Sequence, residues 1–131
     1  MADFLNSYRT LTPYLVVPDA DGAVKFLQAA FGAVEVSCDR NGEGAIVHGE
    51  YRVGDSLVML GQAGPGCPAL GAALYVWVPD VDSVYAKALA AGATSSYAPE
   101  DKPYGHRNAG VVDGNGLTWW IGSPVPSEDR G

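Results

Sequence analysis

The chain contains two copies of one sequence pattern. Residues 14–19, Tyr-Leu-Val-Val-Pro-Asp, return as residues 75–80, Tyr-Val-Trp-Val-Pro-Asp, and Leu60-Gly61 returns as Ile121-Gly122. Both matches have an offset of 61, since 75 − 14 and 122 − 61 give the same value. A shared offset on both sides of a variable middle indicates a duplicated unit of about 60 residues. The repeat therefore predicts two modules of one fold and matches each position in one half to a position in the other.

Helix caps and periodicity define the elements of each copy. After an apolar strand at 11–18, Asp19 can cap a helix with apolar residues at helical spacing, and Gly32 is placed to end it. Asp80 and Gly92 take these places in the second copy, with a slip of one residue. Strand-like runs follow each helix, at 34–39, 45–53 and 56–61 and then at 94–97, 107–113 and 117–122. Each copy is thus predicted to be β-α-β-β-β, which makes the fold class α+β.

The length of 131 residues is typical of a single domain, here built from two modules. We expect the modules at about 11–61 and 73–123. The Gly- and Pro-rich stretch 62–72 is predicted to be the linker between them. Residues 124–131 have little apolar surface and are predicted to be a loose tail.

The overall charge is acidic. Eight Lys and Arg residues against fifteen Asp and Glu residues give a net charge of −7. This argues against nucleic acid or an anionic membrane as partner and favours a cationic ligand, although simple solubility explains it as well. The first residues lack the pattern of a signal peptide, and no apolar stretch reaches the roughly 20 residues that span a bilayer, so we expect a cytoplasmic protein. Cys38 and Cys67 lack CxxC or zinc spacing and are expected to be reduced.

Strand alternation predicts which side chains of the strand at 45–53 can face a ligand. The apolar set, which should face the helix, is Val47, Tyr51 and Val53. The opposite, concave face then carries His48, Glu50 and Arg52.

Hairpin register extends this face to the neighbouring strands. If Gly54-Asp55 forms a two-residue turn, Glu50 pairs with Met59 and brings Met59 to the concave face. The repeat matches Met59 to Trp120 and Tyr14 to Tyr75, whereas Trp119 should face the helix.

An aromatic cup results, with His48 and Glu50 at one side; its other members are Tyr14, Met59, Tyr75, Trp77 and Trp120. Aromatic side chains give large contact areas with few rotatable bonds and polar tips that orient a ligand, as small-molecule sites require. The alternative for any single aromatic residue is ordinary core packing. As a set, these residues indicate a binding site.

The chain resembles the glyoxalase, bleomycin-resistance and extradiol-dioxygenase superfamily, also called vicinal oxygen chelate proteins. The resemblance covers about residues 11–123 and rests on the repeated Val-Pro-Asp, the doubled β-α-β-β-β and the closing stretch 113–122. It is closest to a branch of short proteins whose shared motifs include Leu11-Thr12-Pro13-Tyr14-Leu15, His48-Gly49-Glu50, Gly54-Asp55-Ser56, Pro103-Tyr104-Gly105-His106-Arg107 and Trp119-Trp120. It implies two sheets that curve into a cleft, and a homodimer with two equivalent clefts.

Enzymes of this superfamily hold one divalent metal with four residues. The resemblance places those positions at Thr12, Met59, Ala73 and Trp120. Ala has no donor atom, Trp offers only an N–H, a thioether suits soft ions, and a lone neutral hydroxyl is weak. We therefore expect no metal and no other cofactor.

Two further groups of residues could contribute to a site. Alternation places His48 and Glu50 on one face about 7 Å apart along the strand, where they could act in acid–base catalysis. A structural, hydrogen-bonded role is the alternative for His48. Tyr104, His106 and Arg107 belong to a Pro-Tyr-Gly-His-Arg stretch that we expect to be a loop at the rim of the cup; a solvated loop without a role in binding is the alternative.

The preferred function is metal-independent binding of a small aromatic or cationic molecule, as in the drug-sequestering antibiotic-resistance members of the superfamily. The predicted contacts are Tyr14, His48, Glu50, Met59, Tyr75, Trp77, Tyr104, Arg107 and Trp120. A glyoxalase-like lyase or isomerase that uses His48 and Glu50, alone or with a divergent metal, is the competing function. A structural or regulatory dimer without ligand is the third possibility.

Overall fold

The computed structural model describes residues 9–125, so most of the predicted tail at 124–131 lies outside the described residues. Contacts divide the chain between Gly71 and Ala72 into two compact units, which we call the first and second module. Between residues 9 and 125, neither helix is long and apolar enough to cross a membrane.

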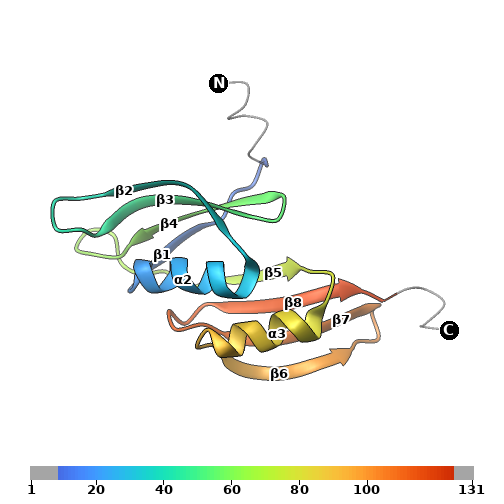
Figure 1. Cartoon of the computed structure of the whole chain (residues 1–131). Coiled ribbons are helices and arrows are strands. Elements are labelled where there is room, and N and C mark those ends of the chain that lie inside the picture. The colour runs from blue at the N-terminus through green and yellow to red at the C-terminus, as the bar shows by residue number, and fades with distance from the viewer. Residues whose placement is uncertain (1–8, 126–131) are drawn as a thin grey trace. The chain divides into compact units, whose positions relative to one another are not determined.

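The first module is a four-stranded sheet with one helix. Its elements are β1 (Tyr14–Val17), α2 (Ala20–Phe31), β2 (Val34–Arg40), β3 (Ile46–Val53) and β4 (Ser56–Gln62). The strands lie in the order β1-β4-β3-β2, with β1 parallel to β4 and the other pairs antiparallel. Helix α2 packs on one face of this sheet (Figure 1).

The second module repeats the first. Its elements are β5 (Ala73–Trp77), α3 (Val81–Ala90), β6 (Thr94–Asp101), β7 (His106–Val112) and β8 (Thr118–Pro124). The strand order β5-β8-β7-β6 and the single parallel pair, β5 with β8, match the first module, and α3 packs across β6, β7 and β8. The predicted α+β fold of two β-α-β-β-β modules is confirmed.

Both helices begin after the predicted caps and α2 ends at the predicted Gly32, whereas α3 ends one residue before the predicted Gly92, with Ala91 as its C-cap. The Asp19 side chain accepts a hydrogen bond from the Gly22 N–H at 3.0 Å, and the Asp80 side chain accepts one from the Ser83 N–H at 3.2 Å. Gly32 ends α2 at a φ of 67°, a left-handed conformation that costs glycine little.

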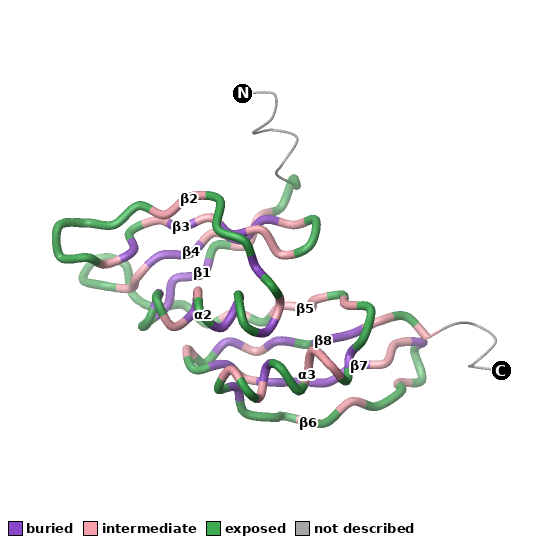
Figure 2. Tube along the Cα trace, viewed as in Figure 1, coloured by how far each residue is buried: buried purple, intermediate pink, exposed green. Residues whose placement is uncertain are grey.

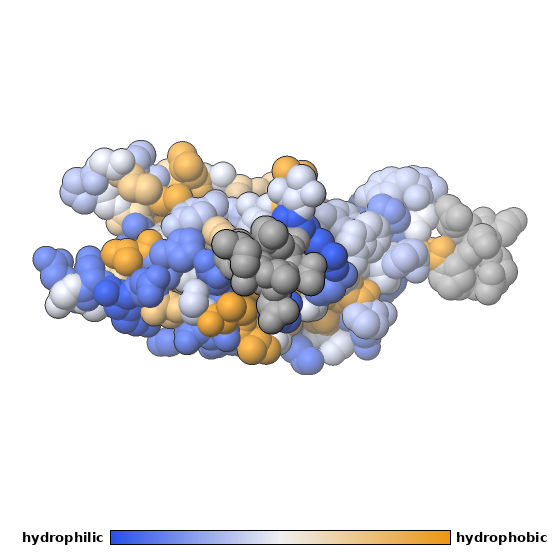
Figure 3. Space-filling model, turned by 90° about the horizontal axis from the view of Figure 1, so that it is seen from above, coloured by the Kyte–Doolittle hydropathy of each residue, from blue (hydrophilic) through white to orange (hydrophobic). Residues whose placement is uncertain are grey.

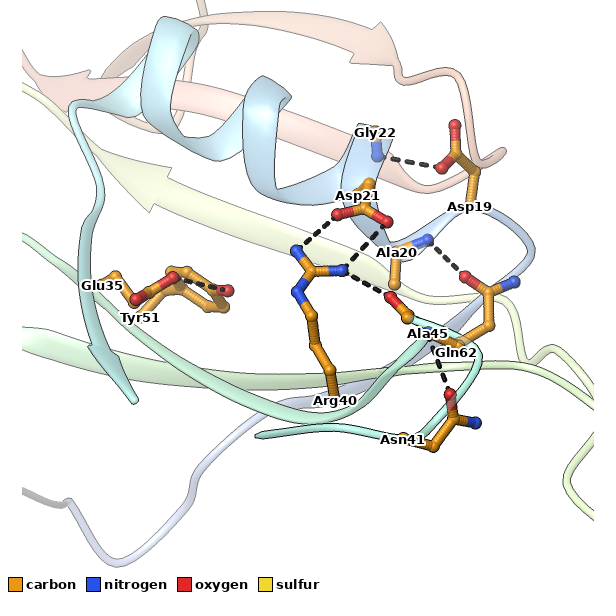
Figure 4. Close-up of polar contacts among 11 residues, drawn as sticks. Asp19, Ala20, Asp21, Gly22, Glu35, Arg40, Asn41, Ala45, Tyr51 and Gln62 are labelled. Carbon is orange, nitrogen blue, oxygen red and sulfur yellow. Dashed lines mark hydrogen bonds and ion pairs between the residues drawn. The ribbon is translucent and has the colours of Figure 1, made fainter. Parts of the chain in front are cut away.

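An ion pair also ties the start of α2 to the sheet (Figure 4). Arg40, at the end of β2, pairs with Asp21 at 2.8 Å, and the Gln62 side chain accepts a hydrogen bond from the Ala20 N–H at 2.9 Å. These contacts hold α2 on one face of the sheet. Within the described residues, no helix of the first module covers the opposite face.

The strand registers agree with the repeat. Tyr14 pairs with Met59, and 61 residues later Tyr75 pairs with Trp120. Glu50 also pairs with Met59, as the two-residue turn predicts. The turn between β7 and β8 is one residue longer, because Asp113 bonds to Leu117 across three residues. Positions in β3 and β7 therefore correspond with an offset of 60.

The core is formed by the helices, β1 and the central strands β3, β4, β7 and β8, whereas β2 and β6 are largely exposed (Figure 2). Tyr51 and Trp119 are buried, as alternation predicts. The prediction that Val47 faces the helix is wrong, because its side chain is 50% exposed whereas Ile46 is only 1% exposed. The cause is a β-bulge: Asp39 of β2 pairs with His48, and the next residue, Arg40, pairs with Ile46. Val47 is therefore the extra, unpaired residue of the bulge.

Candidate functional site

An aromatic cluster forms on the face of the second sheet that α3 does not cover. Its members are Tyr75 and Trp77 from β5, His106 from β7 and Tyr104 from the preceding turn. Ring centroids lie 4.7 Å apart between Tyr75 and Trp77, 4.8 Å between Trp77 and His106, and 5.0 Å between Tyr104 and His106. We call this surface the helix-free face of the second module; Trp120 shares it, as the register partner of Tyr75.

A buried amide holds the tyrosines of this face. Asn108 is 1% exposed, and its Nδ2 donates hydrogen bonds to the hydroxyls of Tyr75 and Tyr104, each at 3.1 Å. Its Oδ1 accepts a hydrogen bond from the Tyr97 hydroxyl at 2.8 Å. The Tyr75 hydroxyl also lies 3.0 Å from His106 Nδ1. One side chain thus fixes hydroxyls from β5, β6 and the turn before β7.

Two glycines allow the tyrosine rings to lie flat on the strands. A Cβ atom on Gly122 would contact the Tyr75 hydroxyl and lie 2.6 Å from its Cε1, and one on Gly110 would lie 2.8 Å from Tyr97 Cε1. Real Cβ atoms do not approach so closely, so a larger residue at either position would lift a ring away from the sheet.

Electrostatic effects on this face come mainly from β6 and the turn that follows it. Burial raises the pKa of the Tyr97 hydroxyl, which therefore keeps its proton at neutral pH. A hydrogen bond to Glu100 raises the pKa of Lys102, whose ammonium group lies 4.4 Å from the centre of the Tyr97 ring. Lys102 is therefore a cation that is already paired with a carboxylate.

The first module has a smaller polar group on its corresponding face. Tyr14 Oη lies 3.2 Å from His48 Nδ1, and His48 Nε2 lies 2.7 Å from Glu50 Oε2. The three side chains form a tyrosine–imidazole–carboxylate chain beside Met59, the register partner of both Tyr14 and Glu50. Such a chain can bind a polar group or pass a proton.

The predicted site residues therefore fall into two groups. The first module brings together Tyr14, His48, Glu50 and Met59, and the second brings together Tyr75, Trp77, Tyr104 and Trp120. Arg107 belongs to neither group.

Arg107 lies on the helix-covered side of the sheet. The strand predicted at 107–113 is β7, which begins at His106, so the expectation that His106 and Arg107 lie in a loop is wrong. Neighbouring strand residues point to opposite faces. Arg107 therefore faces α3, where it pairs with Asp82 at 2.9 Å and with Asp101 at 3.1 Å.

Sequence reasoning missed the residues that organise the face. Asn108 is a lone amide in a strand, and Tyr97 belongs to no motif. Gly122 belongs to the repeated pair Ile121-Gly122, but the repeat alone did not indicate that the Tyr75 ring packs against it. The repeat does point to Asn108: positions in β3 and β7 correspond with an offset of 60, so Asn108 in the second module corresponds to His48 in the first. Both side chains bond to the tyrosine of the first strand.

Large apolar side chains are exposed on this surface. Trp77 is 55% exposed, Tyr104 59% and Trp120 36%, whereas neighbouring Trp119 is 3% exposed. Hydrophobic side chains stand among hydrophilic ones on the molecular surface (Figure 3). Monomeric proteins rarely expose aromatic groups of this size together without a binding role.

The four positions at which the resemblance expects a metal do not fit one. Met59 offers a thioether and Trp120 an indole N–H, while Thr12 has a neutral hydroxyl that donates to the Arg9 carbonyl and Ala73 has no donor atom. Over residues 9–125, no three His, Cys, Asp or Glu side chains gather closely enough to hold a metal ion.

Comparison with known proteins gives relatives by sequence and by structure. No protein-family model matches the chain. The uncharacterized protein Mb0911c of Mycobacterium bovis is 35% identical over 135 residues, which cover 92% of this chain and 87% of that protein.

Solved structures share the fold over nearly the whole chain. TioX from Micromonospora sp. ML1 has a TM-score of 0.72 at 27% identity and covers 90% of this chain and 98% of its own. A member of the glyoxalase/bleomycin resistance protein/dioxygenase superfamily from Sphaerobacter thermophilus has a TM-score of 0.70 at 19% identity, covering 88% and 96%. TnmS3, described as an antibiotic-binding protein from Streptomyces sp. CB03234, has a TM-score of 0.70 at 20% identity, covering 88% and 95%.

Proposed function

Since the chain has the fold of the glyoxalase/bleomycin resistance protein/dioxygenase superfamily, we propose that it binds a small aromatic molecule, without a metal, on the helix-free face of the second module. The observation that supports this most strongly is the exposed aromatic cluster whose hydroxyls are held by buried Asn108. A flat aromatic ligand would stack on rings that are already fixed in place. Little side-chain entropy would then be lost on binding.

The comparisons are compatible with this function. TnmS3 has the same fold and is described as antibiotic-binding, so sequestration of a drug-like molecule, and with it antibiotic resistance, is the physiological role we propose. A homodimer in the cytoplasm is part of the proposal, and light scattering of the purified protein tests its oligomeric state.

A thermal-shift screen of planar aromatic compounds on metal-free protein tests the binding function. A ligand that binds only the folded state at 100 times its Kd adds about 2.7 kcal/mol to the free energy of unfolding, which a melting curve resolves. Trp77→Ala should abolish the shift, and Val34→Ala, which truncates an exposed apolar residue of β2, should keep it. An unchanged shift in Trp77→Ala would contradict binding at this face.

The hydrogen-bonded chain Tyr14–His48–Glu50 favours a second candidate function, acid–base catalysis of the glyoxalase-like lyase or isomerase type. In this function His48 Nδ1 would take a proton through the Tyr14 hydroxyl, and the Glu50 carboxylate would stabilise the imidazolium. Turnover of methylglyoxal with glutathione that persists in a metal chelator and is lost in His48→Asn would support it. Absence of such turnover, with aromatic binding intact, would leave sequestration as the function.

A further inference from the structure

Only one orientation of the Asn108 side-chain amide satisfies every donor and acceptor in its hydrogen-bond network. Asn108 has two N–H donors and one carbonyl, and it contacts two hydroxyls on one side and one on the other. If the amide were turned over, one N–H would be buried without an acceptor, at a cost of about 1–3 kcal/mol. In the described part of the chain, no buried side-chain nitrogen or oxygen lacks a partner. Nδ2 therefore donates to both Tyr75 and Tyr104.

This orientation sets the proton positions at His106. Because the Tyr75 hydroxyl accepts from Asn108, its own proton is available for His106 Nδ1, 3.0 Å away. A neutral imidazole that accepts at Nδ1 carries its proton on Nε2. A protonated imidazole also has a proton on Nε2. When Nδ1 accepts the Tyr75 proton, and also when the ring is protonated, His106 therefore offers an N–H at Nε2.

The same reasoning applies to Tyr104. Its hydroxyl accepts from Asn108, so its proton is not used in that bond, and the side chain is 59% exposed. The indoles of Trp77 and Trp120 have only N–H donors. Among the described residues, the carboxylate that acts on the Tyr97 hydroxyl of this network is that of Glu100, and it is bonded to Lys102.

We infer that the helix-free face of the second module selects aromatic molecules that carry hydrogen-bond-accepting oxygens, with aromatic carboxylates preferred over aromatic cations. Stacking on Trp77 and Tyr75 holds the ring, while the Tyr104 O–H and the His106 Nε2–H donate to the ligand oxygens. The inference rests on the proposed binding function and specifies the ligand class. It differs from the expectation drawn from net charge, since the local groups are donors although the whole chain is acidic.

The test compares three ligands with the same ring: 2-naphthoate, 2-naphthylmethylammonium and 2-methylnaphthalene. Affinities are measured by calorimetry at about 0.15 M salt, where charges farther than roughly 8 Å are screened. We expect 2-naphthoate to bind most tightly. Tyr104→Phe, which keeps the ring and removes the donor, should weaken 2-naphthoate about tenfold, as for one hydrogen bond to a charged group, and leave the other two ligands unchanged.

Tyr85→Phe is the matched control, because it removes the same atom from a tyrosine of α3 that bonds to Ser95 instead. It should leave all three affinities unchanged. Equal or tighter binding of the ammonium ligand, or loss of all three affinities alike in Tyr104→Phe, would overturn the inference while aromatic binding stands. Failure of all three ligands to bind the wild-type protein would overturn the proposed function, and the inference with it.

Discussion

At the scale of single residues, the helix-free face depends on Asn108. Its amide is buried and joins hydroxyls from β5, β6 and the turn before β7. A hydrogen bond between two buried groups adds modestly to the free energy of unfolding. Removing one partner lowers that free energy more, because the other group is then buried without a hydrogen bond. Each of its partners can therefore be tested by deleting a single oxygen.

Tyr97→Phe should lower the free energy of unfolding by about 1–3 kcal/mol, because it leaves Asn108 Oδ1 buried without its donor. Urea unfolding gives this value. Tyr85→Phe, whose hydroxyl bonds to exposed Ser95, should change stability by less than about 0.5 kcal/mol. Equal losses in the two variants would show that Asn108 does not depend on Tyr97.

At the scale of helices and strands, much of the molecule could be predicted from the sequence. Both N-terminal helix caps, the hairpin at Gly54-Asp55 and the pairing of Tyr14 with Met59 follow from local chemistry and the period of a strand, and the structure agrees. The bulge that exposes Val47 could not be predicted, because one inserted residue reverses alternation without changing composition.

The candidate site was less predictable than the fold. The Pro-Tyr-Gly-His-Arg stretch predicts that Arg107 lies at the rim of the cup, but Arg107 is in β7 and Asp82 of α3 holds its side chain on the other face. Asp82 lies 61 residues after Asp21, which pairs with Arg40 in the first module. The repeat therefore matches the two aspartates, but it does not match Arg107 to Arg40. The role of Asn108 depends on three tyrosines that are distant in sequence, and only the folded sheet brings them together.

Gly122→Ala should displace the Tyr75 ring and break its bonds to His106 and Asn108. Overpacking of this kind costs about 1–3 kcal/mol, and aromatic binding should weaken as well. Gly114→Ala is the control, since a Cβ there would meet no atom within 4 Å. Unfolding curves and ligand titrations on both variants check this; a Gly122→Ala protein with wild-type stability and affinity would contradict it.

The ion pair between α2 and β2 predicts a small pH dependence. The hydrogen bond from Arg40 lowers the pKa of Asp21 below its ordinary value of 3.8, so the pair stabilises the fold above that pH and the effect is lost as pH falls below it. Both side chains are about half exposed, which limits the effect to roughly 1 kcal/mol or less. Asp21→Asn should therefore lower stability slightly at pH 7 and not at pH 2. A larger loss at pH 2 than at pH 7 would show that the sign is wrong.

At the scale of the whole molecule, the duplication gave two similar modules with different chemistry. The first holds a tyrosine–histidine–carboxylate chain and the second an aromatic face with an amide at the equivalent position. The net charge of −7 acts over longer distances and favours the approach of cations, whereas the groups in contact with a ligand determine what stays bound.

Purified protein should contain no stoichiometric divalent metal after dialysis, because Thr12, Met59, Ala73 and Trp120 supply no competent ligand set. Elemental analysis measures this. About one zinc, nickel, manganese or iron per chain, lost on replacement of His48 or Glu50 by Ala, would contradict the expectation and support the enzyme function.

The three tryptophans allow the most direct test of aromatic binding on the helix-free face. Trp77 and Trp120 are exposed there, whereas Trp119 is buried and its Nε1 donates to Asp113 at 2.8 Å. Indole N–H signals in ¹⁵N-labelled protein, assigned with single Trp→Phe variants, can be followed during titration with 2-naphthoate. We predict saturable shifts of the Trp77 and Trp120 signals and an unmoved Trp119 signal. Shifts confined to Trp119, or no shift of Trp77 and Trp120 at concentrations that raise the melting temperature, would show that the ligand binds elsewhere.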